Sequence, residues 1–218
     1  MSRGRLVVLE GPEGIGKSTQ AARLRDHLAA RKIDVELIRE PGGTPVGEAI
    51  RAILLTPGRD LPPAAEALLF MASRAVVITE RVRPALDRGA FVIADRFFLS
   101  TYAYQIAGRG LGEEEVRLAN RLATGGLVPD LTLLLDVPVH TALGRARGRG
   151  SSDRIESASD GFHERVAEAF RTFESEEWQR THRECGPIIA VDGSGTAEDV
   201  SGRIVNVVRG RWPETFPS

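Results

Sequence analysis

The sequence is poor in cysteine, in long apolar runs and in excess charge of either sign. Cys185 is the single cysteine, so the chain can form neither an intramolecular disulfide nor a multi-cysteine metal site. No segment approaches the roughly 20 apolar residues that span a bilayer, and the apolar run near the N-terminus is too short for a signal sequence. The formal net charge of −1 gives no overall attraction to nucleic acid or membranes. We therefore expect a cytoplasmic protein that binds neither.

Histidine is also scarce, and its spacing excludes a common kind of metal site. His27, His140, His163 and His182 show no ligand spacing such as H-x-x-x-H. We expect all four to be surface residues.

The chain does contain short apolar runs that alternate with segments of helical period. Continuous runs of this kind are typical of strands buried on both faces of a parallel sheet, and they lie at residues 6–9, 35–38, 91–94, 131–137 and 188–191. Thr44-Pro45 is a plausible helix start, and Gly125-Gly126 closes a helix marked by Val116, Ala119 and Leu122. Phe162, Val166, Phe170 and Phe173 mark one helical face, and Val200, Ile204 and Val207 mark another. This alternation predicts one α/β domain over residues 1–218, with right-handed crossovers.

A glycine-rich loop follows the first predicted strand. Residues 11–18, GPEGIGKS, match G-x-x-x-x-G-K-[ST] in full, between a predicted strand and a predicted helix. The glycines let the backbone amides face inward and hold phosphate, while the lysine reaches the β- and γ-phosphates and the serine is placed for Mg²⁺. The predicted ATP-binding residues here are Gly11, Pro12, Glu13, Gly14, Ile15, Gly16, Lys17, Ser18 and Thr19.

Several classes of phosphate-loop protein are compatible with this loop alone. A GTPase would need the guanine-reading motif N-K-x-D, which the sequence lacks. A motor ATPase usually carries an apolar run that ends in Asp-Glu, whereas the third predicted strand is followed by Asp95-Arg96. An arginine at that position is suited to an enzyme that holds a second phosphate. The pattern favours phosphoryl transfer to an anionic acceptor.

Further motifs resemble those of the thymidylate kinase family over nearly the whole chain. REPGGT (residues 39–44), LLFMASR (68–74), DRFFLSTYAYQ (95–105) and DRIE (153–156) occur in the expected order. The resemblance implies a three-layer P-loop nucleoside monophosphate kinase fold with a five-stranded parallel sheet and a mobile lid. It implies ATP-dependent phosphorylation of thymidine monophosphate (dTMP) to thymidine diphosphate, which feeds dTTP synthesis, with Mg²⁺ as cofactor. It also implies a homodimer, and the apolar residues of segments 68–82 and 113–124 favour the same conclusion.

The same resemblance assigns roles on the acceptor side. Phe70 would stack on the base while Arg74 donates to a carbonyl oxygen such as thymine O4. Arg39 and Arg96 would hold the acceptor phosphate, and Asp95 would either hold Mg²⁺ through water, beside Ser18, or orient Arg96. The dTMP-binding residues implied are Glu13, near the 3′-hydroxyl of the sugar, and Arg39, Phe70, Arg74, Arg96, Thr101, Tyr104 and Gln105.

The lid is predicted at about residues 145–156, where arginine and glycine alternate. Gly14 stands where some relatives carry a basic residue within the phosphate loop, so the chain resembles the bacterial branch, in which lid arginines supply that charge. Arg149 and Arg154 are therefore expected to be catalytic, together with Lys17 and Arg96, and Arg145 is expected to contact ATP.

Two alternatives stay open at this point. A kinase for another acceptor, such as a deoxynucleoside or a different monophosphate, is one, although Arg39 and Arg96 argue against an acceptor without phosphate. A nucleotide-dependent switch or regulatory ATPase is the other, although the missing guanine motif argues against a switch.

Overall fold

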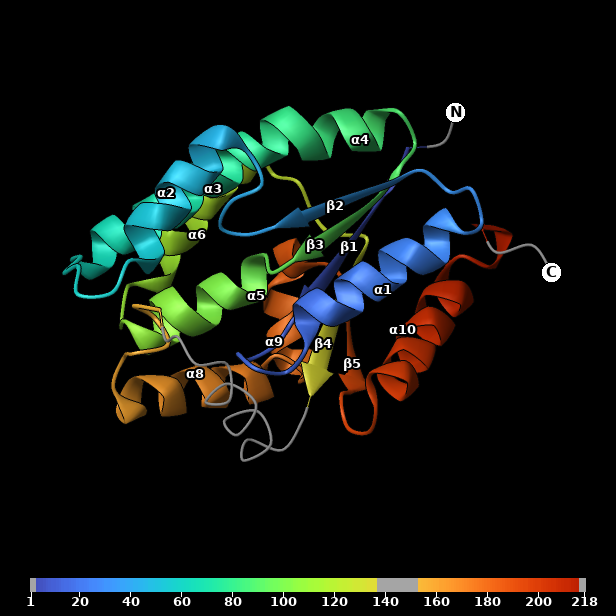
Figure 1. Cartoon of the computed structure of the whole chain (residues 1–218). Helices are drawn as coiled ribbons and strands as arrows, with labels where there is room; N and C mark the ends of the chain where they lie inside the picture. Colours follow the sequence, from blue (N-terminus) through green and yellow to red (C-terminus); the bar gives the residue numbers. More distant parts are fainter. Residues whose placement is uncertain (1–2, 137–152, 216–218) are drawn as a thin grey trace.

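A parallel sheet of five strands, in the order β2-β3-β1-β4-β5, forms the centre of the molecule (Figure 1). The structure is a computed structural model that describes residues 3–136 and 153–215. The strands are β1 (Arg5–Glu10), β2 (Val35–Arg39), β3 (Phe91–Asp95), β4 (Leu131–Asp136) and β5 (Ile188–Asp192). All five apolar runs are thus confirmed as strands, although Val137 of the fourth run lies outside the described residues.

Two helices, α1 (Lys17–Ala29) and α10 (Ala197–Arg211), cover one face of the sheet (Figure 1). Leu24 of α1 and Ile204 of α10 belong to the same buried cluster as Val7 of β1. Leu6 and Val8 belong to the cluster on the other face. Alternate residues of a strand point to opposite faces, so this division shows that β1 is buried on both sides.

The other face is covered by the remaining described helices, which form the third layer (Figure 1). The π-helical turns Ile78–Val82 and Tyr102–Gly108 extend α3 and α5. Short 3₁₀ turns lie at Arg183–Cys185 and Pro213–Thr215. The helices are α2 (Pro45–Leu55), α3 (Pro63–Val77), α4 (Arg83–Asp87), α5 (Phe98–Thr101), α6 (Glu113–Thr124), α8 (Asp160–Thr172) and α9 (Glu176–Thr181). None of the helices in the described part of the chain is long and apolar enough to cross a membrane.

Local sequence signals explain several helix ends. Thr44 caps α2, because its side chain accepts a hydrogen bond from the Gly47 N–H at 3.0 Å. Thr196 and Asp199 form a reciprocal capping box at the start of α10. At the other end of a helix, α6 stops at Gly125, whose φ of 57° lies in the left-handed region that glycine tolerates. The start of α2 and the end of α6 confirm the predicted boundaries.

One leucine of α6 faces outward, and one histidine that we expected at the surface is buried. Leu122 is 86% exposed, because the buried positions of α6 are instead Val116, Asn120 and Thr124, spaced four residues apart. His182 is buried rather than at the surface: its ring stacks on Trp178, and its Nε2 lies 3.0 Å from the Glu113 carboxylate. In both cases the packing of neighbouring helices decides the exposure, and helical period alone does not show it.

Candidate active site

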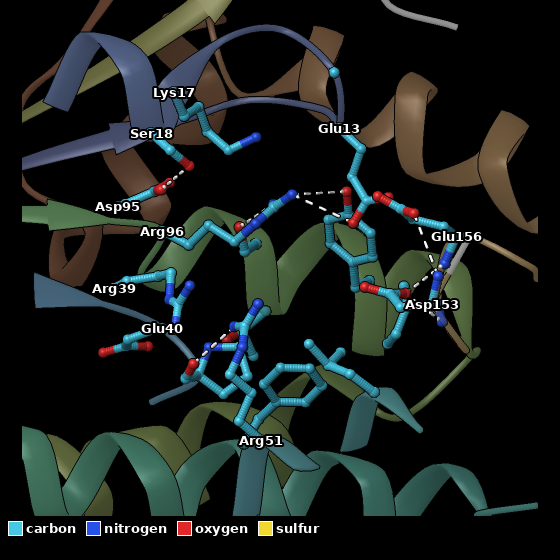
Figure 2. A pocket seen from close by; sticks show the side chains of 18 of the residues that line it. Glu13, Lys17, Ser18, Arg39, Glu40, Arg51, Asp95, Arg96, Asp153 and Glu156 are labelled. Atoms are coloured by element: carbon cyan, nitrogen blue, oxygen red, sulfur yellow. Dashed lines mark hydrogen bonds and ion pairs between the residues drawn. The ribbon is translucent and has the colours of Figure 1, made fainter. Parts of the chain in front are cut away.

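A cavity of about 210 Å³ lies at the carboxyl edge of β1, β2 and β3 (Figure 2). This edge is where open α/β sheets bind ligands. Most of the predicted site residues line the cavity together: Glu13, Gly14, Gly16, Lys17, Ser18, Thr19, Arg39, Phe70, Arg74, Asp95, Arg96, Thr101, Tyr104 and Gln105. The remaining loop residues, Gly11, Pro12 and Ile15, lie within the phosphate loop but do not line the cavity.

The phosphate loop connects β1 to α1 and needs its glycines for two different reasons. Gly11 has a φ of 136°, and an added Cβ would lie 2.7 Å from the Leu135 carbonyl oxygen. Gly16 has a φ of 99° with open space around it, so its conformation rather than its size requires glycine. The loop therefore leads into the N-terminus of α1, where backbone N–H groups and the helix dipole favour phosphate.

Lys17 is buried at the start of α1. Its ammonium donates to the carbonyl oxygens of Gly11, at 2.9 Å, and Pro12, at 2.6 Å. Burial, together with the positive charge of Arg96, lowers the pKa of Lys17 to about 7, although nearby carboxylates oppose the change. An anion that binds beside a lysine with so low a pKa stabilises the charged form of that lysine.

Ser18 and Asp95 bring a hydroxyl and a carboxylate together beside Lys17. The Ser18 hydroxyl donates to the Asp95 carboxylate, as Figure 2 shows. The described residues contain no cluster of three or more His, Cys, Asp or Glu side chains that could hold a metal ion. Two oxygen donors suit Mg²⁺, which usually keeps several waters and binds through one or two protein groups plus substrate phosphates. The donor set thus fits Mg²⁺.

Arg96 lies at the middle of the cavity (Figure 2), in an uncommon backbone conformation. Its φ of 75° is unusual for a residue other than glycine, and such strain persists only where the surroundings hold it. Its guanidinium donates to the Ser100 hydroxyl at 3.0 Å and lies 3.4 Å from the Glu13 carboxylate. It also lies over the Tyr104 ring, with 5.1 Å from Cζ to the ring centroid. These contacts orient the guanidinium between the phosphate loop and the acceptor side.

Glu10 holds this strained turn, a role that sequence reasoning missed. Its carboxylate is fully buried and accepts from the backbone N–H groups of Phe97, at 2.7 Å, and Ser100, at 3.0 Å. It also accepts from the Ser100 hydroxyl at 2.7 Å. A carboxylate at the end of a buried strand, followed by a phosphate loop, is the only sequence signal for it. The residue links β1 to the turn that carries Arg96.

Arg39 and Arg51 lie on the opposite side of the cavity from the phosphate loop (Figure 2). Arg39 is half exposed and lies 3.4 Å from the Glu48 carboxylate. Arg51, which sequence reasoning also missed, donates to the Pro41 carbonyl oxygen at 2.9 Å. Burial and the neighbouring Arg39 lower the pKa of Arg51. The sequence could have indicated Arg51 through its spacing from Leu55: the two residues are one helical turn apart on α2, and both line the cavity.

Arg74 is almost completely enclosed, with 2% of its surface exposed. Its guanidinium donates to the Glu40 carboxylate at 2.7 Å and to the Phe97 carbonyl oxygen at 2.8 Å. It also donates to Thr101 at 2.9 Å and to Asn120 at 2.6 Å. An arginine has five N–H donors, so these four bonds leave one N–H for a ligand. Burial raises the pKa of Glu40 to about 7, and the pairing with Arg74 opposes that rise.

The half-buried ring of Phe70 and the side chain of Gln105 line the same cavity as Arg74. The Gln105 side chain is 2% exposed, and its Nε2 donates to the Glu66 carboxylate at 3.2 Å. A ring, one free guanidinium N–H and an amide are the groups that recognise a flat, hydrogen-bonding ligand.

The lid prediction needs a correction at Arg154. Arg145 and Arg149 lie outside the described residues, but Arg154 is described and does not line the cavity. It donates to the Glu66 carboxylate at 2.6 Å and to the Leu54 carbonyl oxygen at 2.7 Å. The other residues of the DRIE motif, Asp153, Ile155 and Glu156, line the cavity instead. In this structure the Arg154 guanidinium is therefore bound to the buried Glu66 carboxylate and does not face the cavity.

Comparison with known proteins places this geometry in a family. A family model described as thymidylate kinase matches residues 9–184. A thymidylate kinase of Alkalilimnicola ehrlichii is 52% identical over 174 residues, which cover 78% of this chain and 79% of that protein. A thymidylate kinase of Rhizorhabdus wittichii is 42% identical over 213 residues, which cover 96% and 99%. One of Deinococcus radiodurans is 47% identical over 180 residues, which cover 83% and 87%.

Proposed function

Because the chain belongs to the thymidylate kinase family, we propose that it transfers the γ-phosphoryl group of ATP to dTMP. The products are ADP and thymidine diphosphate, a precursor for dTTP synthesis. The observation that carries this proposal is that one cavity joins the phosphate loop, with Lys17, to the acceptor residues Arg39, Arg96 and Gln105. A donor and an acceptor phosphate can therefore meet in one enclosed space.

The donor phosphates bind to the phosphate loop and the N-terminus of α1. Lys17 moves its ammonium from the carbonyl oxygens of Gly11 and Pro12 to the β- and γ-phosphates, whose charge is the stronger partner. Ser18 and Asp95 are the residues that would hold Mg²⁺, and the ion would supply positive charge that offsets the charge of the phosphates. Arg145 and Arg149 would add positive charge from the lid.

The acceptor phosphate binds to the arginines that surround the middle of the cavity. Arg39 reaches the cavity from the end of β2, Arg51 from α2 and Arg96 from the turn after β3, and Figure 2 shows Arg96 between Lys17 and Arg39. A guanidinium can bond two phosphate oxygens at once, so these groups fix the orientation of the acceptor as well as its position. An acceptor that brings no phosphate would make no use of the three guanidinium groups that face the cavity.

The nucleoside of the acceptor fills the other part of the cavity. Phe70 stacks on the base, and the remaining N–H of Arg74 donates to the carbonyl at position 4. Glu13 faces this side, since its carboxylate lies 3.4 Å from Arg96, and it accepts from the 3′-hydroxyl of the sugar. Thr101 and Tyr104 complete the wall.

No side-chain nucleophile is required for this reaction. The phosphate oxygen of dTMP attacks the γ-phosphorus of ATP, and the bond from that phosphorus to the β-phosphate oxygen breaks. Alignment of the two phosphates and neutralisation of their charge by Lys17 and Arg96 lower the barrier. The strained turn that Glu10 holds keeps Arg96 in place between the two phosphates.

A coupled ADP-release assay over a panel of nucleoside monophosphates tests this function. We expect dTMP to give the highest kcat/KM. An equally good or better purine monophosphate would refute the acceptor assignment, and activity with thymidine but not with dTMP would point to a nucleoside kinase.

We also propose a homodimer and a cytoplasmic location. On the adjoining helices α3 and α6, Leu68, Leu118 and Leu122 are 61%, 60% and 86% exposed. Exposed large apolar side chains gathered on two neighbouring helices are typical of a protein–protein interface. The location follows from the reaction, because ATP and dTMP are nucleotides of the cytoplasm.

A further inference from the structure

Glu66 is a fully buried carboxylate on α3 whose two oxygens are both occupied. One oxygen accepts from the Gln105 amide nitrogen at 3.2 Å and from the Arg109 Nε at 3.1 Å. The other accepts from Arg109 at 2.9 Å and from Arg154 at 2.6 Å. Of these partners, only Gln105 lines the cavity. Glu66 thus touches the cavity through a single side chain.

The charge of Glu66 determines which end of the Gln105 amide faces it. Burial by itself would raise the pKa of Glu66, but hydrogen bonds from Arg109 and Arg154 outweigh burial and lower that pKa below its ordinary value. An ionised carboxylate only accepts hydrogen bonds, so Gln105 must turn its NH₂ group toward Glu66. Its carbonyl oxygen, Oε1, then points the other way, and no group in the described part of the chain donates to it.

We propose that Glu66 is a positioning residue that orients the Gln105 amide, so that its carbonyl oxygen selects an acceptor base with a proton on ring nitrogen N3. Thymine and uracil carry that proton, whereas cytosine presents a lone pair there. A carbonyl oxygen facing a lone pair leaves two acceptors opposed, which costs about ten- to a hundredfold in efficiency. This inference rests on the proposed function. It means that Glu66, a residue that does not line the cavity, helps to determine which base the cavity accepts.

Glu66→Gln is the test. The new side chain keeps its oxygen for the two arginine N–H groups on the Arg154 side, where two charged donors meet. Its NH₂ group then faces Gln105 and the Arg109 Nε–H, and that N–H loses its acceptor. Gln105 then gains by turning over and presenting its own NH₂ group to the base. We expect the ratio of kcat/KM for dTMP to that for dCMP to fall about tenfold or more, mainly through KM. An unchanged ratio in a folded E66Q enzyme would overturn the proposal.

A double-variant cycle and a matched control separate positioning from stability. In the Gln105→Met background, Glu66→Gln should no longer change the dTMP to dCMP ratio, because the group it orients is gone. Arg109→Met also removes an ion pair of Glu66 but leaves an acceptor-only carboxylate, so it should lower Tm and leave the ratio unchanged. A ratio shift in R109M equal to that in E66Q would mean that loosened packing is responsible.

The wild-type protein provides a readout that does not depend on a variant folding. Neutron diffraction of its dTMP complex locates the deuterons of the Gln105 amide. Deuterons directed at Glu66 support the proposal, and deuterons directed at the base overturn it. A wild-type enzyme that does not phosphorylate dTMP would instead refute the proposed function, whatever the orientation of the amide.

Discussion

Lys17 shows how strongly its surroundings alter a single charged residue. Burial removes its ammonium from water and Arg96 lies nearby, so its pKa is about 7 instead of 10.5. The unfolded chain therefore binds more protons than the folded protein between about pH 7 and 10.5. The contribution of Lys17 to the free energy of unfolding is therefore lowest below about pH 7, and it rises as the pH increases to about 10.5. The same perturbation makes Lys17 sensitive to bound phosphate.

The first prediction is that ATP binding takes up protons. Phosphate beside Lys17 raises its pKa, so at pH 8 a large part of one proton should be taken up per ATP bound. Calorimetry in buffers of different ionisation enthalpy measures this uptake. The Lys17→Ala variant should stay folded, take up far less, and lose most turnover. Equal uptake by variant and wild type would mean that another group titrates.

Two arginines on different sides of the reaction should differ in their kinetic effect. Arg39→Ala should raise KM for dTMP about ten- to a hundredfold, because it removes a charge-assisted hydrogen bond to the acceptor. Arg149→Ala should lower kcat and leave that KM nearly unchanged. A guanidinium at a phosphoryl-transfer transition state is worth about 10³–10⁵ in rate, and part of that is shared here with Lys17 and Arg96. Steady-state kinetics of both variants checks the contrast, which fails if Arg149→Ala turns over like wild type.

At the scale of elements, Arg154 connects the residues after the lid to α2 and α3. Its backbone N–H donates to Leu55 at 3.1 Å, and its side chain bonds Leu54 and Glu66. The segment from residue 153 onward is thereby attached to the wall of the acceptor site. Asp153 strengthens the attachment, since its carboxylate accepts from the backbone N–H groups of Ile155, at 2.8 Å, and Glu156, at 2.9 Å.

We therefore predict that Arg154→Met acts first on stability. It leaves the Leu54 carbonyl without a donor and Glu66 with one arginine fewer, which should cost about 1–3 kcal/mol. Chemical denaturation measures the change, and kcat at a temperature where the variant is folded should fall less than in Arg149→Ala. A large loss of kcat with unchanged stability would instead return Arg154 to the catalytic role that the sequence suggested.

At the scale of the whole molecule, the face of α3 and α6 is the prominent exposed apolar feature among the described residues. Leu118 and Leu122 are one helical turn apart and point away from the sheet, while α6 buries Val116, Asn120 and Thr124 on its inner side. The acceptor residues Phe70 and Arg74 lie on α3, so an interface on this face would also support the acceptor site.

We predict that the wild-type protein sediments as a dimer at micromolar concentration. The double variant Leu118→Glu, Leu122→Glu should sediment as a monomer, since it would bury charges in the interface without partners. Val46→Glu is the matched control, because Val46 is 52% exposed on α2 and should not affect association. A wild-type protein that is only monomeric would contradict the proposal.

The sequence by itself determined the fold and the position of the site. The apolar runs predicted all five strands, and most clearly the central β1, β3 and β4, because a strand covered on both faces must be apolar at nearly every position. The phosphate loop could be recognised in the sequence because local backbone geometry requires its glycines, as the φ values of Gly11 and Gly16 show. The candidate site residues at strand ends, such as Arg39 and Asp95, could be located because parallel strands end at one edge.

Only the tertiary structure decided which polar side chains face the ligand and which face one another. Glu10, Glu66 and Arg51 are ordinary charged residues in the sequence. They gain roles only through partners that lie 10 to 90 positions away or through a shared cavity wall. Arg154 is the converse case, since a motif placed it at the site and a buried carboxylate on α3 holds it elsewhere. The physical reason is that hydrogen bonds and ion pairs depend on distances of a few ångströms, which the chain sets only after its helices have packed.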